Sequence, residues 1–152
     1  AARETNDEDS INIWTINNDI LYSLLCIAFF ADQEIDESEK SVIFDSYKLF
    51  VPSLDNESFN KDFGATTNKF INLKNEDKRQ TQFEDSLSVI KESENLNREN
   101  LIQLINCYVN IANADEFIHE NEVMLIQNAI ENWELKISVN KPKSGNKLEL
   151  KE

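Results

Sequence analysis

The chain has 152 residues, enough for one domain with a single core, and it contains only two glycines and two prolines. An average chain of this length has about 11 glycines and about 8 prolines, and β-sheet proteins need such residues for their many tight turns, so a helical fold is expected. The formal charge of −14, from 29 acidic and 15 basic residues, repels nucleic acid and anionic lipid and argues against direct binding to either.

The distribution of charge and apolar residues divides the chain into three parts. Residues 1–12 are polar and acidic without periodicity, and we expect a flexible lead-in there. Residues 13–136 form the predicted all-helical domain. Residues 137–152 are rich in lysine and weakly patterned, which predicts a loosely ordered tail. With Lys136 included, this end carries a net +3, which leaves −17 on the preceding residues.

Helical spacing of apolar residues predicts six segments, of which the third is broken by Gly64 and fits one helix or two short ones. The segments are 20–31, 37–51, 55–74, 76–91, 98–114 and 120–136. In the first segment only Ser23 is not apolar, which predicts a central core helix too short to span a membrane. The expected fold is an all-α, single-domain bundle of about six or seven helices.

The segment 98–114 is a second predicted core helix, for which Asn97 is the expected N-cap. It carries a stripe of four amides: Gln103, Asn106, Asn110 and Asn113. Such a stripe fits a half-buried seam between helices or the lining of a ligand groove. Cys107 in this helix and Cys26 in the first lie in apolar runs, so we expect both to be buried and unpaired.

The chain contains an internal repeat at an offset of 83 residues. Ala31–Ile43 (ADQEIDESEKSVI) and Ala114–Ile126 (ADEFIHENEVMLI) are identical at six of 13 positions, where chance predicts about one. Each copy follows a core helix and opens an amphipathic helix. The sequence therefore predicts a helix-corner-helix unit that occurs twice, with the two core helices packed together about an approximate two-fold axis.

The acidic residues of each corner fit two interpretations. Helix capping explains many of them, because Asp36 and Glu39 have the spacing of a capping pair and negative charge favours a helix N-terminus. We also expect Ile35 and Ile118 to be buried and to anchor each corner to the core, which is a structural role. Clustered carboxylates are also the ligands that calcium and magnesium prefer, although the spacing is not that of an EF-hand.

At these corners the chain resembles the TerB-like domains associated with tellurite resistance, which are all-helical duplications with an Ala-Asp-Gly-x-Ile corner followed by a glutamate. The matching residues are Ala31, Asp32, Ile35 and Glu39 in the first copy and Ala114, Asp115, Ile118 and Glu122 in the second. The family's glycine is replaced by Gln33 and Glu116, so the corner must take another backbone path or strain these residues. The resemblance covers about residues 16–135.

The resemblance implies a non-enzymatic component of a stress response, with a cation site and with partner proteins near the membrane. The candidate ligands of a calcium or magnesium ion are Asp32, Glu34, Glu39, Asp115, Glu116 and Glu122. No other cofactor is expected. The expected location is cytoplasmic, peripheral to the membrane only through partners, because the residues show no signal peptide and no disulfide framework.

Enzymatic readings are weak because one histidine and two apparently buried cysteines give few nucleophile pairs. His119 stands where the first copy has Asp36, and a capping or surface role competes there with a metal-ligand role. A pair of carboxylates acting as acid and base is the one enzymatic arrangement that remains. The alternative function is an acidic interaction protein, an immunity factor or nucleic-acid mimic, that blocks a basic partner.

Overall fold

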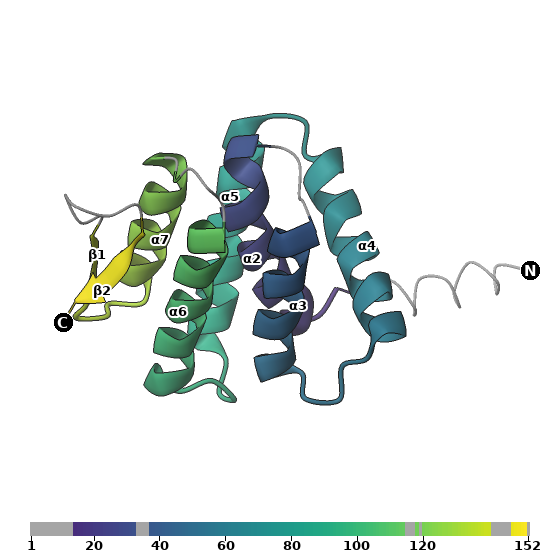
Figure 1. Ribbon diagram of the computed structural model, residues 1–152, viewed down its shortest axis with the longest axis horizontal. Helices are drawn as coiled ribbons and strands as arrows, with labels where there is room; N and C mark the ends of the chain where they lie inside the picture. Colours follow the sequence, from purple (N-terminus) through teal and green to yellow (C-terminus); the bar gives the residue numbers. More distant parts are fainter. Residues whose placement is uncertain (1–13, 33–36, 115–117, 119, 141–146, 152) are drawn as a thin grey trace, which may run out of the picture.

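The computed structural model describes residues 14–32, 37–114, 118, 120–140 and 147–151, with only the backbone described at 30–32. Six α-helices and a two-stranded antiparallel ribbon make up these residues (Figure 1). They are α2 Ile16–Asp32, α3 Glu37–Phe50, α4 Asn56–Asn72, α5 Glu76–Glu92, α6 Arg98–Ala114, α7 Glu120–Asn132, β1 Ser138–Asn140 and β2 Glu149–Lys151. The predicted all-α, single-domain bundle is confirmed.

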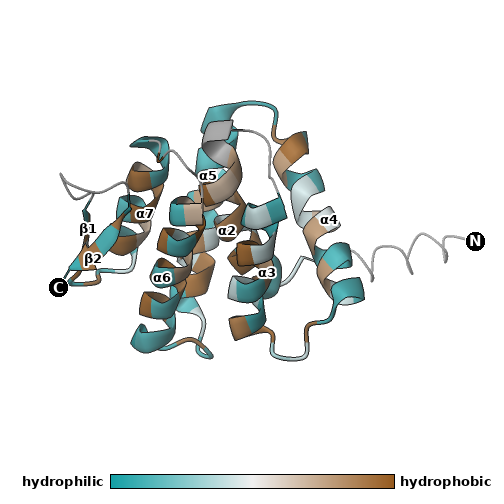
Figure 2. Cartoon of the chain, viewed as in Figure 1, coloured by the Kyte–Doolittle hydropathy of each residue, from teal (hydrophilic) through white to brown (hydrophobic). Residues whose placement is uncertain are grey.

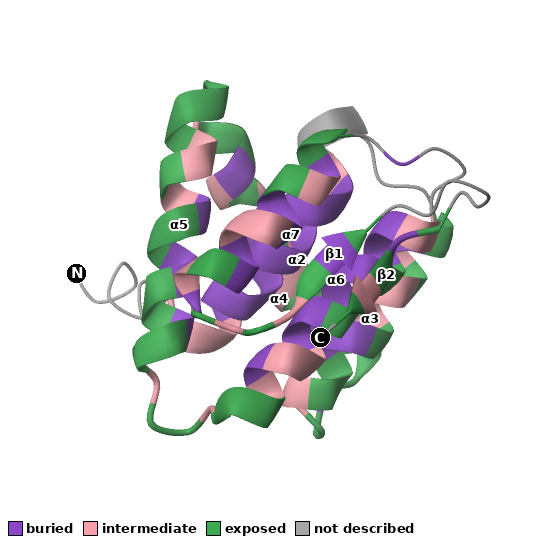
Figure 3. Cartoon of the chain, turned by 90° about the vertical axis from the view of Figure 1, so that its left-hand side faces the viewer, coloured by how far each residue is buried: buried purple, intermediate pink, exposed green. Residues whose placement is uncertain are grey.

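Helix α2 is the centre of the bundle. Every residue from Ile20 to Ala28 is buried, and the helix contacts α3, α4, α5, α6 and α7. Figure 3 shows buried residues along α2, whereas the outer side of α5 is exposed. A helix that is apolar on all sides requires cover on all sides, and the other helices provide it.

Each copy of the repeated unit packs against the other in the same way. Helix α2 packs directly on α6, as predicted for the two core helices. In addition, α3 of the first unit packs on α6 of the second, and α7 of the second unit packs on α2 of the first. This reciprocal pattern is what a two-fold relation between the units produces.

Helix termini follow local sequence signals. Asn97 accepts a hydrogen bond from the Asn100 backbone N–H at 2.9 Å, which confirms it as an N-cap, and Asn100 Oδ1 accepts one from the Asn97 N–H at 2.9 Å. Helix α4 continues through Gly64 as one helix, because an isolated glycine costs only about 1 kcal/mol there. Helix α7 ends earlier than expected, at Asn132, since Glu134 adopts a left-handed φ of 54°.

The amide stripe of α6 matches the expected half-buried seam only in part. Asn106 and Asn110 are exposed, and Gln103 is only partly buried. Figure 2 shows α6 alternating between hydrophilic and hydrophobic residues, as a helix with one outward face does. Gln103 and Asn113 are partly buried, but within the described residues no hydrogen bond joins Gln103, Asn106 or Asn110 to another helix. Among the four amides, Asn113 is the one that hydrogen-bonds to a described segment far away in the sequence, at Leu148.

The lysine-rich end differs from the expected loose tail in the part that is described. Strands β1 and β2 pair, with Val139 opposite Leu150. Val139 and Leu148 are buried against the core. Asn113 fixes this ribbon to α6, because its Oδ1 accepts from the Leu148 backbone N–H at 2.7 Å and its Nδ2 donates to the Leu148 carbonyl at 3.2 Å. The sequence does not predict this ribbon, because two apolar residues in separate short strands show no periodicity.

Candidate functional site

The repeated corners are described only in part. Among the six predicted ligands, Glu39 and Glu122 are described fully, whereas Glu34, Asp115 and Glu116 lie outside the described residues, as does the side chain of Asp32. Gln33, Ile35, Asp36 and His119 also lie outside them. The described part of the candidate site therefore consists of Glu39, Glu122 and the helices that carry them.

Glu39 and Glu122 are equivalent in the repeat and are both buried, with 3% and 1% of their surface exposed. Each is the third residue of its helix, α3 or α7. Their neighbours Glu37 and Glu120 are exposed. Charged side chains are rarely buried to this extent, so the same burial in both copies marks one specific position of the unit.

Both glutamates lie at the same end of the bundle. In Figure 1 the C-terminal ends of α2 and α6 and the N-terminal ends of α3 and α7 are all toward the upper end of the view. The first turns of α3 and α7 also present backbone N–H groups, whose partial positive charge stabilises a nearby carboxylate. A carboxylate at such a position can act as a helix cap or as an oxygen ligand of a cation. The repeat predicted the equivalence of the two glutamates but not their burial.

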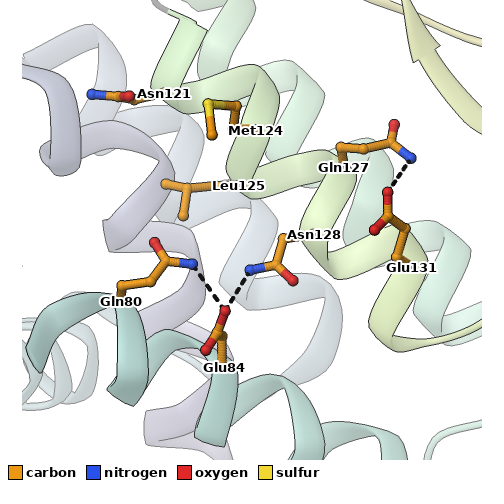
Figure 4. A pocket seen from close by; sticks show the side chains of 8 residues that line it. All are labelled: Gln80, Glu84, Asn121, Met124, Leu125, Gln127, Asn128 and Glu131. Atoms are coloured by element: carbon orange, nitrogen blue, oxygen red, sulfur yellow. Dashed lines mark hydrogen bonds between the residues drawn. The ribbon is translucent and has the colours of Figure 1, made fainter. Parts of the chain in front are cut away.

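A groove of about 460 Å³ lies between α5 and α7 (Figure 4). Its lining residues are Gln80, Glu84, Asn121, Met124, Leu125, Gln127, Asn128 and Glu131. Glu84 Oε2 accepts hydrogen bonds from Gln80 Nε2 at 3.2 Å and from Asn128 Nδ2 at 3.1 Å, and the second of these joins the two helices. The sequence does not predict this groove, because helical periodicity does not show that α5 and α7 are neighbours.

A buried carboxylate that sequence analysis did not single out lies near the start of α2. Asp19 is 5% exposed, and its Oδ1 accepts hydrogen bonds from Ser86 Oγ at 2.8 Å and from Trp14 Nε1 at 3.0 Å. Burial raises the pKa of Asp19, and the two hydrogen bonds and the charge of Lys69 act against that rise. The contacts join α2, α5 and the segment before α2, so we assign Asp19 a structural role.

Both cysteines are buried and unpaired, as predicted. Burial raises the pKa of the Cys26 thiol and that of the Cys107 thiol. A thiol with a raised pKa is protonated at neutral pH and is a poor nucleophile. These two residues therefore give no support to a cysteine-based reaction.

Within the described residues, no group of three or more histidine, cysteine, aspartate or glutamate side chains is placed to hold a metal ion. The side chains of Asp32, Glu34, Asp115 and Glu116, four of the six predicted ligands, lie outside the described part. No described helix is long and apolar enough to cross a membrane. Comparison with family models, curated proteins and solved structures finds no match to this chain.

Proposed function

We propose that this chain is a non-enzymatic, TerB-like stress-response domain that binds a divalent cation, calcium or magnesium, at its paired acidic corners. The observation that carries the proposal is the burial of Glu39 and Glu122 at equivalent positions of the two units. A buried glutamate supplies a hard oxygen atom of the kind that calcium and magnesium bind.

The arrangement of the helices supports this proposal in a second way. Helix α3 packs on α6 and helix α7 packs on α2, so the two units pack reciprocally. This reciprocal packing fits the duplication of TerB-like domains. The C-terminal ends of α2 and α6 and the N-terminal ends of α3 and α7 lie toward one end of the bundle (Figure 1). In this proposal the domain acts through partner proteins at the cytoplasmic side of a membrane, and Asp32, Glu34, Asp115 and Glu116 complete the ligand set.

The test is thermal unfolding of the metal-free chain in 150 mM monovalent salt, with and without millimolar calcium or magnesium. At this ionic strength the Debye length is about 8 Å, so general screening is nearly complete and a further response reports a specific site. A cation at a hundredfold excess over its Kd adds about 2.7 kcal/mol, which raises the Tm by about 5 to 10 °C for a domain of this size.

Two double variants separate a cation site from helix capping. Asp32→Asn with Asp115→Asn should abolish the cation response and leave the metal-free Tm almost unchanged, because asparagine lacks the charge but keeps the size and much of the hydrogen bonding of aspartate. Glu92→Gln with Glu94→Gln removes the same charge from exposed positions and should keep the response. If neither cation shifts the Tm of the unaltered chain, the corners are helix caps and the proposal fails.

A further inference from the structure

The groove between α5 and α7 offers hydrogen-bond acceptors. Gln80 and Asn128 both direct their amide nitrogens to Glu84, and Gln127 Nε2 donates to Glu131 Oε2 at 3.2 Å (Figure 4). An amide that turns its nitrogen to a carboxylate presents its carbonyl oxygen elsewhere. Three amide oxygens and two carboxylates are thus held at this surface.

The charge of the groove has one sign. Its described lining residues include Glu84 and Glu131 but no lysine or arginine. Helix α7, which forms one wall, carries three acidic residues and no basic residue. Such a surface favours a ligand that is cationic and rich in donors, as lysine and arginine side chains are.

The groove also contains an apolar contact surface. Met124 is 66% exposed, the largest exposure among the large apolar side chains of the described residues, and Leu125 beside it is buried. Methionine is flexible and polarizable, and it adapts to partner surfaces of different shape. The aliphatic stems of arginine and lysine can pack on it while their charged groups reach the carboxylates.

We infer that the α5–α7 groove is a docking site for a basic segment of a partner protein, with arginine or lysine side chains bound by Glu84 and Glu131 and an apolar contact on Met124. The charge complementarity of the groove supports this occupant over an acidic or purely apolar one. The inference does not depend on a cation at the corners, because none of its residues is one of the predicted ligands.

The probe is a capped hexapeptide that carries three arginines and one leucine among glycines, titrated into the full chain in 150 mM salt. Backbone amide shifts of the labelled protein should change mainly within residues 80–84 and 121–131. Glu84→Gln with Glu131→Gln should raise the Kd about tenfold, which corresponds to about 1.4 kcal/mol for the loss of two exposed ion pairs together. Both residues are exposed, so this double variant should fold normally.

Two controls determine whether binding is specific to the groove. Glu92→Gln with Glu94→Gln removes the same two negative charges outside the lining residues and should change the Kd less than twofold. The same peptide with glutamates in place of arginines should not bind. Equal weakening by both double variants, shifts spread over the acidic surface, or no binding at millimolar peptide would each overturn the inference.

Discussion

The two copies of the repeated unit begin with core helices of very different surroundings. Helix α2 is covered on all sides, because α4 and α5 pack on it in addition to α3, α6 and α7. Helix α6 packs mainly on α2, α3 and α7 and leaves one face to solvent. Equivalent positions in a duplicated sequence therefore need not have equivalent environments. The segments inserted between the copies determine which helix is enclosed.

Ile27 and Asn110 illustrate the difference most clearly. They are equivalent at the 83-residue offset, yet Ile27 is fully buried and Asn110 is exposed. Ile27→Asn should destabilise the fold by about 3 to 5 kcal/mol, because it removes buried apolar surface and buries an amide. Asn110→Ile should change stability by less than about 0.5 kcal/mol.

Urea unfolding of both variants checks this pair. If Ile27→Asn does not fold, Ile27→Val gives a milder measure, with an expected loss of about 1 kcal/mol. Equal losses for Asn110→Ile and Ile27→Asn would mean that α6 is enclosed as completely as α2.

The amide stripe of α6 provides the next comparison. Asn113→Ala removes both hydrogen bonds to Leu148 and should cost about 1 kcal/mol, with faster hydrogen exchange at Val139 and Leu150. Asn106→Ala removes only a bond to the Ile102 carbonyl within the same helix, so it should be neutral or slightly stabilising. Unchanged exchange in the ribbon after Asn113→Ala would show that Val139 and Leu148 alone hold it.

The smallest expected effect is a pH dependence of the unfolding free energy that arises from Asp19. The counterpart of Asp19 in α6 is Ile102, which does not titrate. Because burial raises the pKa of Asp19 in the folded state, that state holds its proton to higher pH than the unfolded chain does. The contribution of Asp19 to stability is thus most favourable below the unfolded pKa and declines as pH rises through the folded pKa.

Asp19→Asn should remove this decline. Urea unfolding from about pH 3 to pH 7 gives the unfolding free energy of the original chain and of Asp19→Asn. The value for the original chain minus the value for the variant should fall as pH rises. Lys69 and Asp85 are the charged groups that act on Asp19, and both are retained in the variant. A difference that is constant with pH would contradict the raised pKa.

Much of the fold could be predicted from the sequence, but less of the candidate site. The helices, the cap at Asn97 and the buried cysteines depend on local spacing, which a single sequence displays. The offset of 83 also identified Glu39 and Glu122 as equivalents. Their burial, and that of Asp19, could not be read from the sequence, because acidic residues near a helix N-terminus are usually capping groups exposed to solvent.

The sequence by itself determined that this chain is helical, where its helices lie and that one unit occurs twice, because propensity, caps and periodicity act within a few residues. The tertiary structure alone decided that α2 is enclosed while α6 is not, that Asn113 fixes the terminal ribbon, and that Glu84 and Asn128 form one groove. Periodicity shows which face of a helix is apolar, but the covering element is chosen by the packing of segments far apart in the chain.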